Sequence, residues 1–233
     1  MIFGLDPLYW ALVMPAFLLA LWAQGKVQMS FRKYSRVPAS SGLTGAQAAY
    51  AMLQAAGLAG SVGIERYGGF LSDHYDPRKR VLRLSPDVYD GRSLAALGVA
   101  CHEAGHAVQH ARNYAPLAVR NAIVPLAGFG SWAAFPMIIL GIIFNWTNLA
   151  LAGLLAFGAI VLFQVINLPV EFNASSRAKE VLAETGMIRG QAEYNGVSSV
   201  LSAAAMTYVA ATVMAAVQLL YFAIRLGLIG GDE

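Results

Sequence analysis

Long apolar stretches alternate with charged blocks along the chain. Four of these stretches carry no charged residue: 8–23, 122–144, 149–166 and 194–224. A bilayer core of about 30 Å needs roughly 20 helical residues, so the pattern predicts four transmembrane helices. A signal peptide is the alternative for the first and shortest stretch. Asp6 precedes it, no basic residue does, and no small-residue cleavage site follows before Lys26, which favours an uncleaved anchor.

The block between the first two apolar stretches has the pattern of a small folded domain. Thr44 is placed to cap a helix that runs to about Ala56. Strand-like sequence follows and predicts a small antiparallel sheet, with strands at 62–67, 70–75 and 81–84. Ser93 is placed to cap a further helix, from Leu94 to about Arg112.

The composition agrees with a membrane protein. Of the 233 residues, 58% are hydrophobic and 12% are charged, about half the charge of an ordinary soluble domain. This excludes a disordered chain and argues against a soluble enzyme. The single cysteine excludes an intrachain disulfide and a thiolate zinc cluster. The net charge of +3 does not predict nucleic-acid binding, because no basic patch is interleaved with aromatic residues.

The basic residues predict the orientation of the chain. They follow the first and third apolar stretches and precede the second and fourth: Lys26, Arg32, Lys33, Arg36, Arg112, Arg120, Arg177, Lys179 and Arg189. The positive-inside rule then places both charged blocks in the cytoplasm and both termini outside. The expected order is a transmembrane helix in 1–25, a cytoplasmic domain in 26–120, two transmembrane helices in 121–168, a cytoplasmic segment in 169–199, and a fourth transmembrane helix with the C-terminus in 200–233.

A metal-binding motif lies on the helix predicted after Ser93. His102, Glu103 and His106 form the pattern His-Glu-x-x-His. Residues four apart share one helix face, so the two histidines can bind one metal ion. Glu103 then lies beside the open coordination position, where it can take a proton from water. The pattern predicts zinc-dependent hydrolysis with Glu103 as the general base.

The third metal ligand has two candidates. His110 lies on the same helix, but it is about 12 Å from His102 along the axis, too far for one ion with bonds of about 2 Å. Glu171 follows the third apolar stretch, on the same predicted side of the membrane as the metal helix. Two imidazoles and a carboxylate are typical catalytic zinc ligands, which favours Glu171. The alternative is an interfacial carboxylate that pairs with Arg177.

These motifs resemble those of the YugP-like membrane zinc metallopeptidases. The resemblance is carried by 102–106 and by Glu-Phe-Asn-Ala-Ser at 171–175, with further matches at 72–77, 82–85 and 205–211. It implies a multi-pass bacterial plasma-membrane peptidase that uses Zn²⁺. The layout is also similar to HtpX-type and CAAX-prenyl-type gluzincin proteases, although Ser175 stands where those proteins have Asp. We therefore expect an α-helical multi-pass membrane protein with a small cytoplasmic α+β zincin-like catalytic domain.

Other polar residues are candidates for supporting roles. A ligating histidine normally donates its second N–H to an oxygen, which Asn173, Ser175 or a backbone carbonyl could supply. Arg177 could steady a ligand or the oxyanion, or be a surface cation. Tyr208 could donate to the oxyanion, or be a packed membrane tyrosine. His110 could support the site or face solvent.

The predicted function is hydrolysis of peptide bonds at the cytoplasmic membrane face, with protein or peptide substrates and the lipid bilayer as partners, and no nucleic acid. An exposed strand, 70–75 or 81–84, could hold the substrate by strand addition. A site-2-type intramembrane protease is one alternative, but it would place the zinc helix inside the bilayer with an Asp-Gly partner motif, which the apolar stretches lack. A non-catalytic zinc carrier is another, but it would need polar residues along several membrane helices. The sequence does not determine the oligomeric state.

Overall fold

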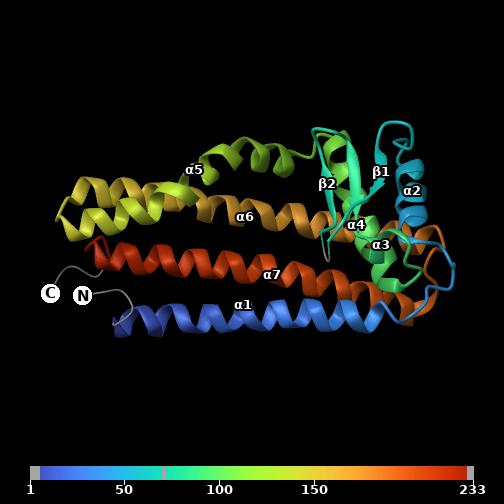
Figure 1. Cartoon of the computed structure of the whole chain (residues 1–233), viewed down its shortest axis with the longest axis horizontal. Helices are drawn as coiled ribbons and strands as arrows, with labels where there is room; N and C mark the ends of the chain where they lie inside the picture. Colours follow the sequence, from blue (N-terminus) through green and yellow to red (C-terminus); the bar gives the residue numbers. More distant parts are fainter. Residues whose placement is uncertain (1–5, 70–71, 230–233) are drawn as a thin grey trace. The chain divides into compact units, whose positions relative to one another are not determined.

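The structure is a computed structural model that describes residues 6–69 and 72–229. These residues form seven α-helices and one three-stranded sheet (Figure 1). The chain divides into two compact units. The first unit consists of Met1–Ala23, Ala118–Leu168 and Thr207–Glu233, and the second consists of Gln24–Leu117 and Pro169–Met206.

Four helices are long and apolar enough to cross a membrane, as predicted: α1 (Pro7–Tyr34), α5 (Ala115–Ile143), α6 (Thr147–Glu184) and α7 (Gly190–Arg225). Each extends beyond the apolar stretch that predicted it. Helix α6 continues through Pro169, so the segment that carries Glu171 is part of the helix and not a connection after it.

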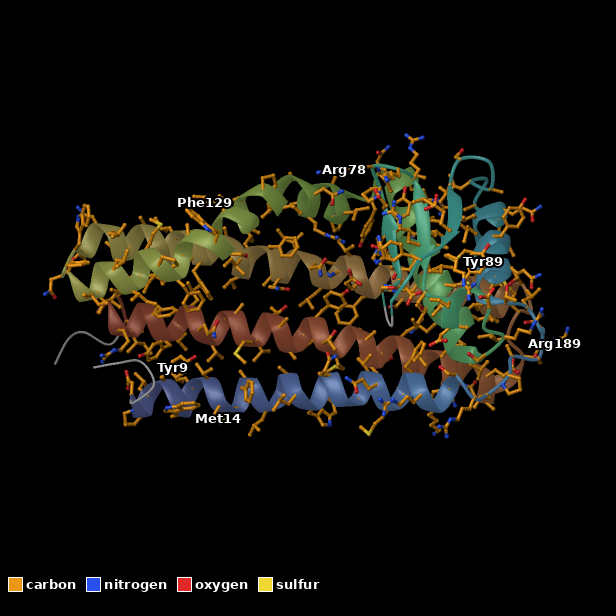
Figure 2. All side chains as sticks on the ribbon, viewed as in Figure 1. Tyr9, Met14, Arg78, Tyr89, Phe129 and Arg189 are labelled. Atoms are coloured by element: carbon orange, nitrogen blue, oxygen red, sulfur yellow. The ribbon has the colours of Figure 1, made fainter. Side chains whose placement is uncertain are left out.

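Apolar side chains of the first unit face both inward and outward. Phe157 and Phe222 pack edge to face, with ring centroids 6.0 Å apart. Many other large side chains point away from the helices, including Phe129 (Figure 2). Trp132 and Leu155 are each 78% exposed. So much exposed apolar surface is costly in water and is suited to a lipid environment.

The second unit contains three further helices, α2 (Gly45–Ala55), α3 (Pro86–Tyr89) and α4 (Leu94–Ala111). Both predicted caps are confirmed. The Thr44 hydroxyl accepts from the Gln47 backbone N–H, and the Gln47 side chain accepts from the Thr44 backbone N–H in return. The Ser93 hydroxyl accepts from the backbone N–H of Ala96 and so begins α4.

The sheet contains β1 (Gly63–Arg66), β2 (His74–Asp76) and β3 (Val81–Leu84) in the order β1-β3-β2. Strand β2 is antiparallel to β3, but β1 is parallel to it, so the prediction of a purely antiparallel sheet is wrong for β1. The reason is the path of the chain. Strands β2 and β3 form a hairpin, and β1 pairs with the other edge of β3. Phe70 and Leu71, which were expected in the second strand, lie outside the described residues.

Helix α4 lies at the centre of the second unit. It packs against α2 on one side and contacts β2 and β3 (Figure 1). Leu53 of α2, Leu82 of β3 and Ala104 of α4 are fully buried in the same apolar core. This packing fixes the rotation of α4 about its axis, and with it the directions of the polar side chains that the helix carries.

Candidate metal centre

Two helices of the second unit bring three potential metal ligands together. Helix α4 contributes His102 and His106, whose rings are 4.8 Å apart between centroids. Helix α6 contributes Glu171, which is 4% exposed. Its Oε2 lies 3.3 Å from His102 Nε2 and 3.6 Å from His106 Nε2. One ligand atom from each residue lies within 4.8 Å of the other two.

These distances fit a zinc ion. Zinc ligands sit about 2.0–2.2 Å from the metal in tetrahedral geometry, which places two ligand atoms roughly 3.3–3.6 Å apart. The separations between Glu171 Oε2 and the two Nε2 atoms fall in that range. A carboxylate with two imidazoles is also a donor set that zinc prefers.

The other ring nitrogen of each histidine has an oxygen partner. His102 Nδ1 lies 3.1 Å from Ser175 Oγ, and His106 Nδ1 lies 3.0 Å from Gln109 Oε1. Because the Gln109 amide oxygen can only accept, the Nδ1 of His106 carries the proton. The lone pair of Nε2 then faces Glu171, which is the tautomer that a metal ligand needs.

Gln109 is the centre of a buried polar network. It is fully buried, and its Nε2 donates to the Val170 carbonyl at 2.8 Å and to Asn173 Oδ1 at 3.0 Å. Arg177 Nε donates to the same Asn173 oxygen at 2.8 Å. Asn173 and Arg177 are therefore linked to His106 through Gln109. The motif alone does not assign a role to Gln109, although its position three residues after His106 on one helix face is a signal for such a role.

A glycine allows α4 and α6 to come this close. A Cβ at Gly105 would lie 2.9 Å from the carbonyl oxygen of Ala174 and 3.2 Å from its Cα. Any larger residue would push the two backbones apart. Since Ala174 lies one helical turn from Glu171, this contact determines how far the carboxylate reaches toward the histidines.

Glu103 is buried beside these three potential ligands, and the sheet holds its carboxylate. Its Oε2 accepts a hydrogen bond from the backbone N–H of Tyr75 in β2, at 3.0 Å. Burial raises the pKa of Glu103, although the nearby His102 and His106 act in the opposite direction. A raised carboxyl pKa suits a group that takes and returns a proton near neutral pH. The sequence analysis did not identify the contact with Tyr75.

Burial and charge act against each other on His106. Burial alone lowers the pKa of this histidine, but the carboxylates of Glu171 and Glu103 favour the protonated ring, outweigh burial and raise the pKa overall. A proton on Nε2 therefore competes with a metal ion for this nitrogen.

The remaining candidates lie outside the group of three. His110 Nδ1 is 2.9 Å from the Tyr75 hydroxyl. Tyr208 lies in the part of α7 that belongs to the first unit, and its role at the oxyanion stays a prediction. Cys101 is fully buried, which raises the pKa of its thiol to about 12 and keeps it protonated.

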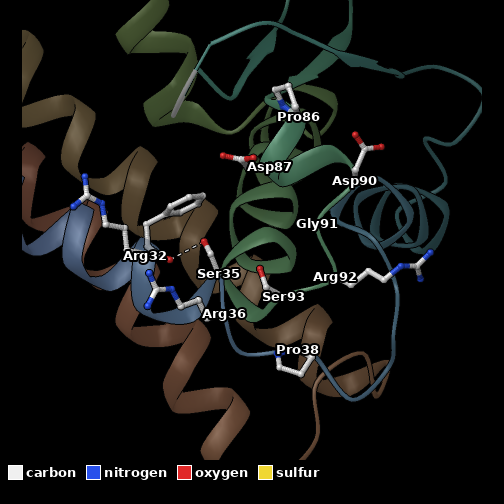
Figure 3. A pocket seen from close by; sticks show the side chains of 11 residues that line it. Arg32, Ser35, Arg36, Pro38, Pro86, Asp87, Asp90, Gly91, Arg92 and Ser93 are labelled. Atoms are coloured by element: carbon white, nitrogen blue, oxygen red, sulfur yellow. Dashed lines mark hydrogen bonds between the residues drawn. The ribbon is translucent and has the colours of Figure 1, made fainter.

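A cavity of about 670 Å³ lies away from the three potential ligands. Arg32, Asp87 and Ser93 are among its lining residues (Figure 3). Ser93 precedes His102 by nine residues, roughly 14 Å along α4. At that distance, and with none of the three potential ligands in its lining, this cavity lies apart from the metal centre.

Four apolar helices and a His-His-Glu group define a membrane protein with a metal centre. Residues 9–227 match the family described as "Putative neutral zinc metallopeptidase". The chain is 49% identical over 215 residues to "Putative membrane protease YugP" of Bacillus subtilis (strain 168), covering 92% of this chain and 94% of that protein. No solved structure matches the chain. The protein belongs to this zinc metallopeptidase family, which confirms the resemblance inferred from the motifs and Zn²⁺ as the cofactor.

Replacing Gln109 with leucine should weaken zinc binding by about ten- to a hundredfold, the usual effect of losing a partner of a ligating histidine. Leucine has a similar volume but cannot accept the proton of His106 Nδ1. Titration of the zinc-loaded protein with a chelator measures the effect. Gln191→Leu is the matched control, because Gln191 is exposed and its side chain donates to Asn195, away from the metal centre. Equal zinc retention by both variants would contradict the role of Gln109.

Proposed function

We propose that the protein is an endopeptidase that cleaves membrane or membrane-associated proteins at the cytoplasmic face of the bacterial plasma membrane. One observation carries the proposal. The buried carboxylate of Glu103 lies beside a group of three zinc ligands and is oriented by the backbone of an edge strand. In this proposal, His102, His106 and Glu171 hold the ion, and the second unit is a zincin-like catalytic domain.

The proposed chemistry is the addition of water to a peptide carbonyl. Bound zinc supplies Lewis acidity and lowers the pKa of a water ligand toward neutrality. Glu103 accepts the proton of the attacking water at Oε1, since Oε2 is held by the Tyr75 N–H. As the C–N bond breaks, Glu103 passes this proton to the leaving amine nitrogen.

The outer edge of β2 is suited to hold an extended peptide. Strand β3 is paired on both sides, so the alternative that Val81–Leu84 receives the substrate is wrong. In an antiparallel pair, the N–H and C=O groups of one residue point to the same side. The Tyr75 N–H donates to Glu103 and so points to the outer edge, away from β3. The Tyr75 carbonyl therefore faces the outer edge as well, where a substrate N–H can donate to it. This supports strand addition beside the metal centre.

Two features favour this function over its alternatives. Helix α4 is not among the four helices that are apolar and long enough to cross a membrane, which argues against a site-2-type intramembrane protease. Glu103 argues against a zinc carrier. It is a buried carboxylate that lies next to the three proposed ligands without being one of them, and zinc binding alone does not require it. The basic residues that flank the apolar helices support the placement in the cytoplasm.

Glu103→Gln should retain zinc and lose proteolysis by about a hundredfold or more, because glutamine can still accept the Tyr75 hydrogen bond but cannot take a proton. Zinc content and cleavage of unfolded protein substrates should be measured on the same preparations. Glu184→Gln, at the exposed end of α6, is the matched control and should behave as wild type. Loss of zinc from Glu103→Gln, or full activity, would refute the role of Glu103.

Cysteine labelling tests the orientation. The only native cysteine is buried, so an introduced cysteine gives the signal. A cysteine at Asn148, which is exposed near the start of α6, should react with an impermeant thiol reagent added to intact cells. A cysteine at the exposed Ser40 should react only after the cells are lysed. The opposite pattern would place the site, and its substrates, outside the cytoplasm.

A further inference from the structure

The face of α4 that carries Glu103 continues into a second cavity. This cavity has a volume of about 360 Å³, near the lower end of the range of small-ligand pockets. Ala107, His110 and Ala111 contribute the α4 wall. They follow Glu103 by four, seven and eight residues and therefore lie on the same side of the helix, one to two turns further on.

Tyr75 joins this cavity to the proposed site of proton transfer. Its backbone N–H donates to Glu103 Oε2 at 3.0 Å, while its side chain lines the cavity and its hydroxyl lies 2.9 Å from His110 Nδ1. A peptide that pairs with the outer edge of β2 at Tyr75 would pass Glu103. Because Tyr75 contacts Glu103 and also lines the cavity, a peptide at this edge has the cavity beside it.

The polar groups of this cavity are basic or neutral. Arg80 is a lining residue, and Asp and Glu are absent from the lining. Arg80 forms no ion pair with any residue in the described part of the chain. Asp76, on the same hairpin, is paired with Arg83 at 3.0 Å and also accepts two backbone N–H groups. The guanidinium of Arg80 is therefore available to an incoming anion.

The backbone at Arg80 is unusual for a residue with a long side chain. Its φ of 53° lies in the left-handed region, which glycine and asparagine adopt more readily. This conformation ends the turn between β2 and β3. His110 adds a second polar group to the cavity. When the Tyr75 hydroxyl donates to Nδ1 of the neutral ring, Nε2 carries the proton and is a donor.

We propose that this cavity binds a carboxylate of the substrate beside the scissile bond, with Arg80 as its main partner and His110 and Asn113 as further hydrogen-bonding groups. The proposal rests on the peptidase function proposed above. A guanidinium binds a carboxylate through two parallel hydrogen bonds, which favours this ligand over other polar groups. The carboxylate can come from an aspartate or glutamate side chain, or from the C-terminus of the peptide.

Peptides of a single parent sequence test the proposal. One set carries Glu, Gln or Leu at the positions beside the cleaved bond, and each peptide is made with a free and an amidated C-terminus. With the full-length, zinc-loaded protein, we expect kcat/KM for the carboxylate-bearing peptide to exceed that for its neutral counterpart by about tenfold. Mass spectrometry of the products locates the cleaved bond. A preference that survives amidation assigns the carboxylate to the side chain, and one that amidation abolishes assigns it to the C-terminus.

Variants of the turn between β2 and β3 identify the residue that binds the carboxylate. Arg80→Leu should bring the ratio for carboxylate and neutral peptides close to one, while its zinc content and melting temperature match those of wild type. Lys79→Leu is the matched control, because Lys79 belongs to the same turn but does not line the cavity. It should keep the wild-type ratio. Equal cleavage of all peptides by wild type, or a ratio unchanged by Arg80→Leu, would overturn the proposal.

A binding measurement separates this proposal from the proposed function. The zinc-loaded Glu103→Gln protein should bind the carboxylate peptide about tenfold more tightly than the neutral one, without cleaving it. If wild type cleaves no peptide but this preference in binding is present, the peptidase function fails and the carboxylate site stands. If the two peptides bind equally to Glu103→Gln and to its Arg80→Leu derivative, the carboxylate site fails.

Discussion

The close contact between α4 and α6 is the constraint on which the metal centre depends. Two of the potential ligands lie on α4, and the third, Glu171, follows His106 by 65 residues. Packed helices are usually 8–10 Å apart between axes. Only a very small residue at the crossing lets short side chains meet around one ion. Gly105 is that residue, since a Cβ there would collide with the backbone of Ala174. The glycine of the motif is therefore part of the geometry of the site.

Burying so many polar groups is tolerable only because they have partners. An unsatisfied buried donor or acceptor costs about 1–3 kcal/mol. Gln109 is fully buried and uses both its amide oxygen and its amide nitrogen, to His106 on one side and to Val170 and Asn173 on the other. The same bonds that satisfy the amide also fix the tautomer of His106. The stability of the helix pair and the readiness of the site to hold zinc thus depend on the same interactions.

The chemistry-bearing residues could be predicted because their signals are local in sequence. The caps at Thr44 and Ser93, the four apolar helices, and the spacing of His102, Glu103 and His106 all depend on near neighbours along the chain. What could not be predicted depends on contacts distant in sequence. The parallel pairing of β1 with β3 is set by the path of the chain across the sheet. The contact of Tyr75 with Glu103 requires β2 to lie against α4, which no local pattern specifies. Glu171 could be expected from its place after the third apolar stretch, but its distances to the two histidines depend on how α4 packs against α6. The contacts of Asn173, Ser175 and Arg177 depend on the same packing.

The metal content of two purified variants tests the central claim most directly. Glu171→Ala removes the carboxylate that lies 3.3 and 3.6 Å from the two imidazoles. His110→Ala removes a histidine of the same helix that bonds to Tyr75 and lies outside the group of three. The account predicts that zinc, measured by mass spectrometry of the metal after equal dialysis, falls strongly in Glu171→Ala and stays near the wild-type level in His110→Ala. An empty His110→Ala protein beside a fully loaded Glu171→Ala protein would contradict it.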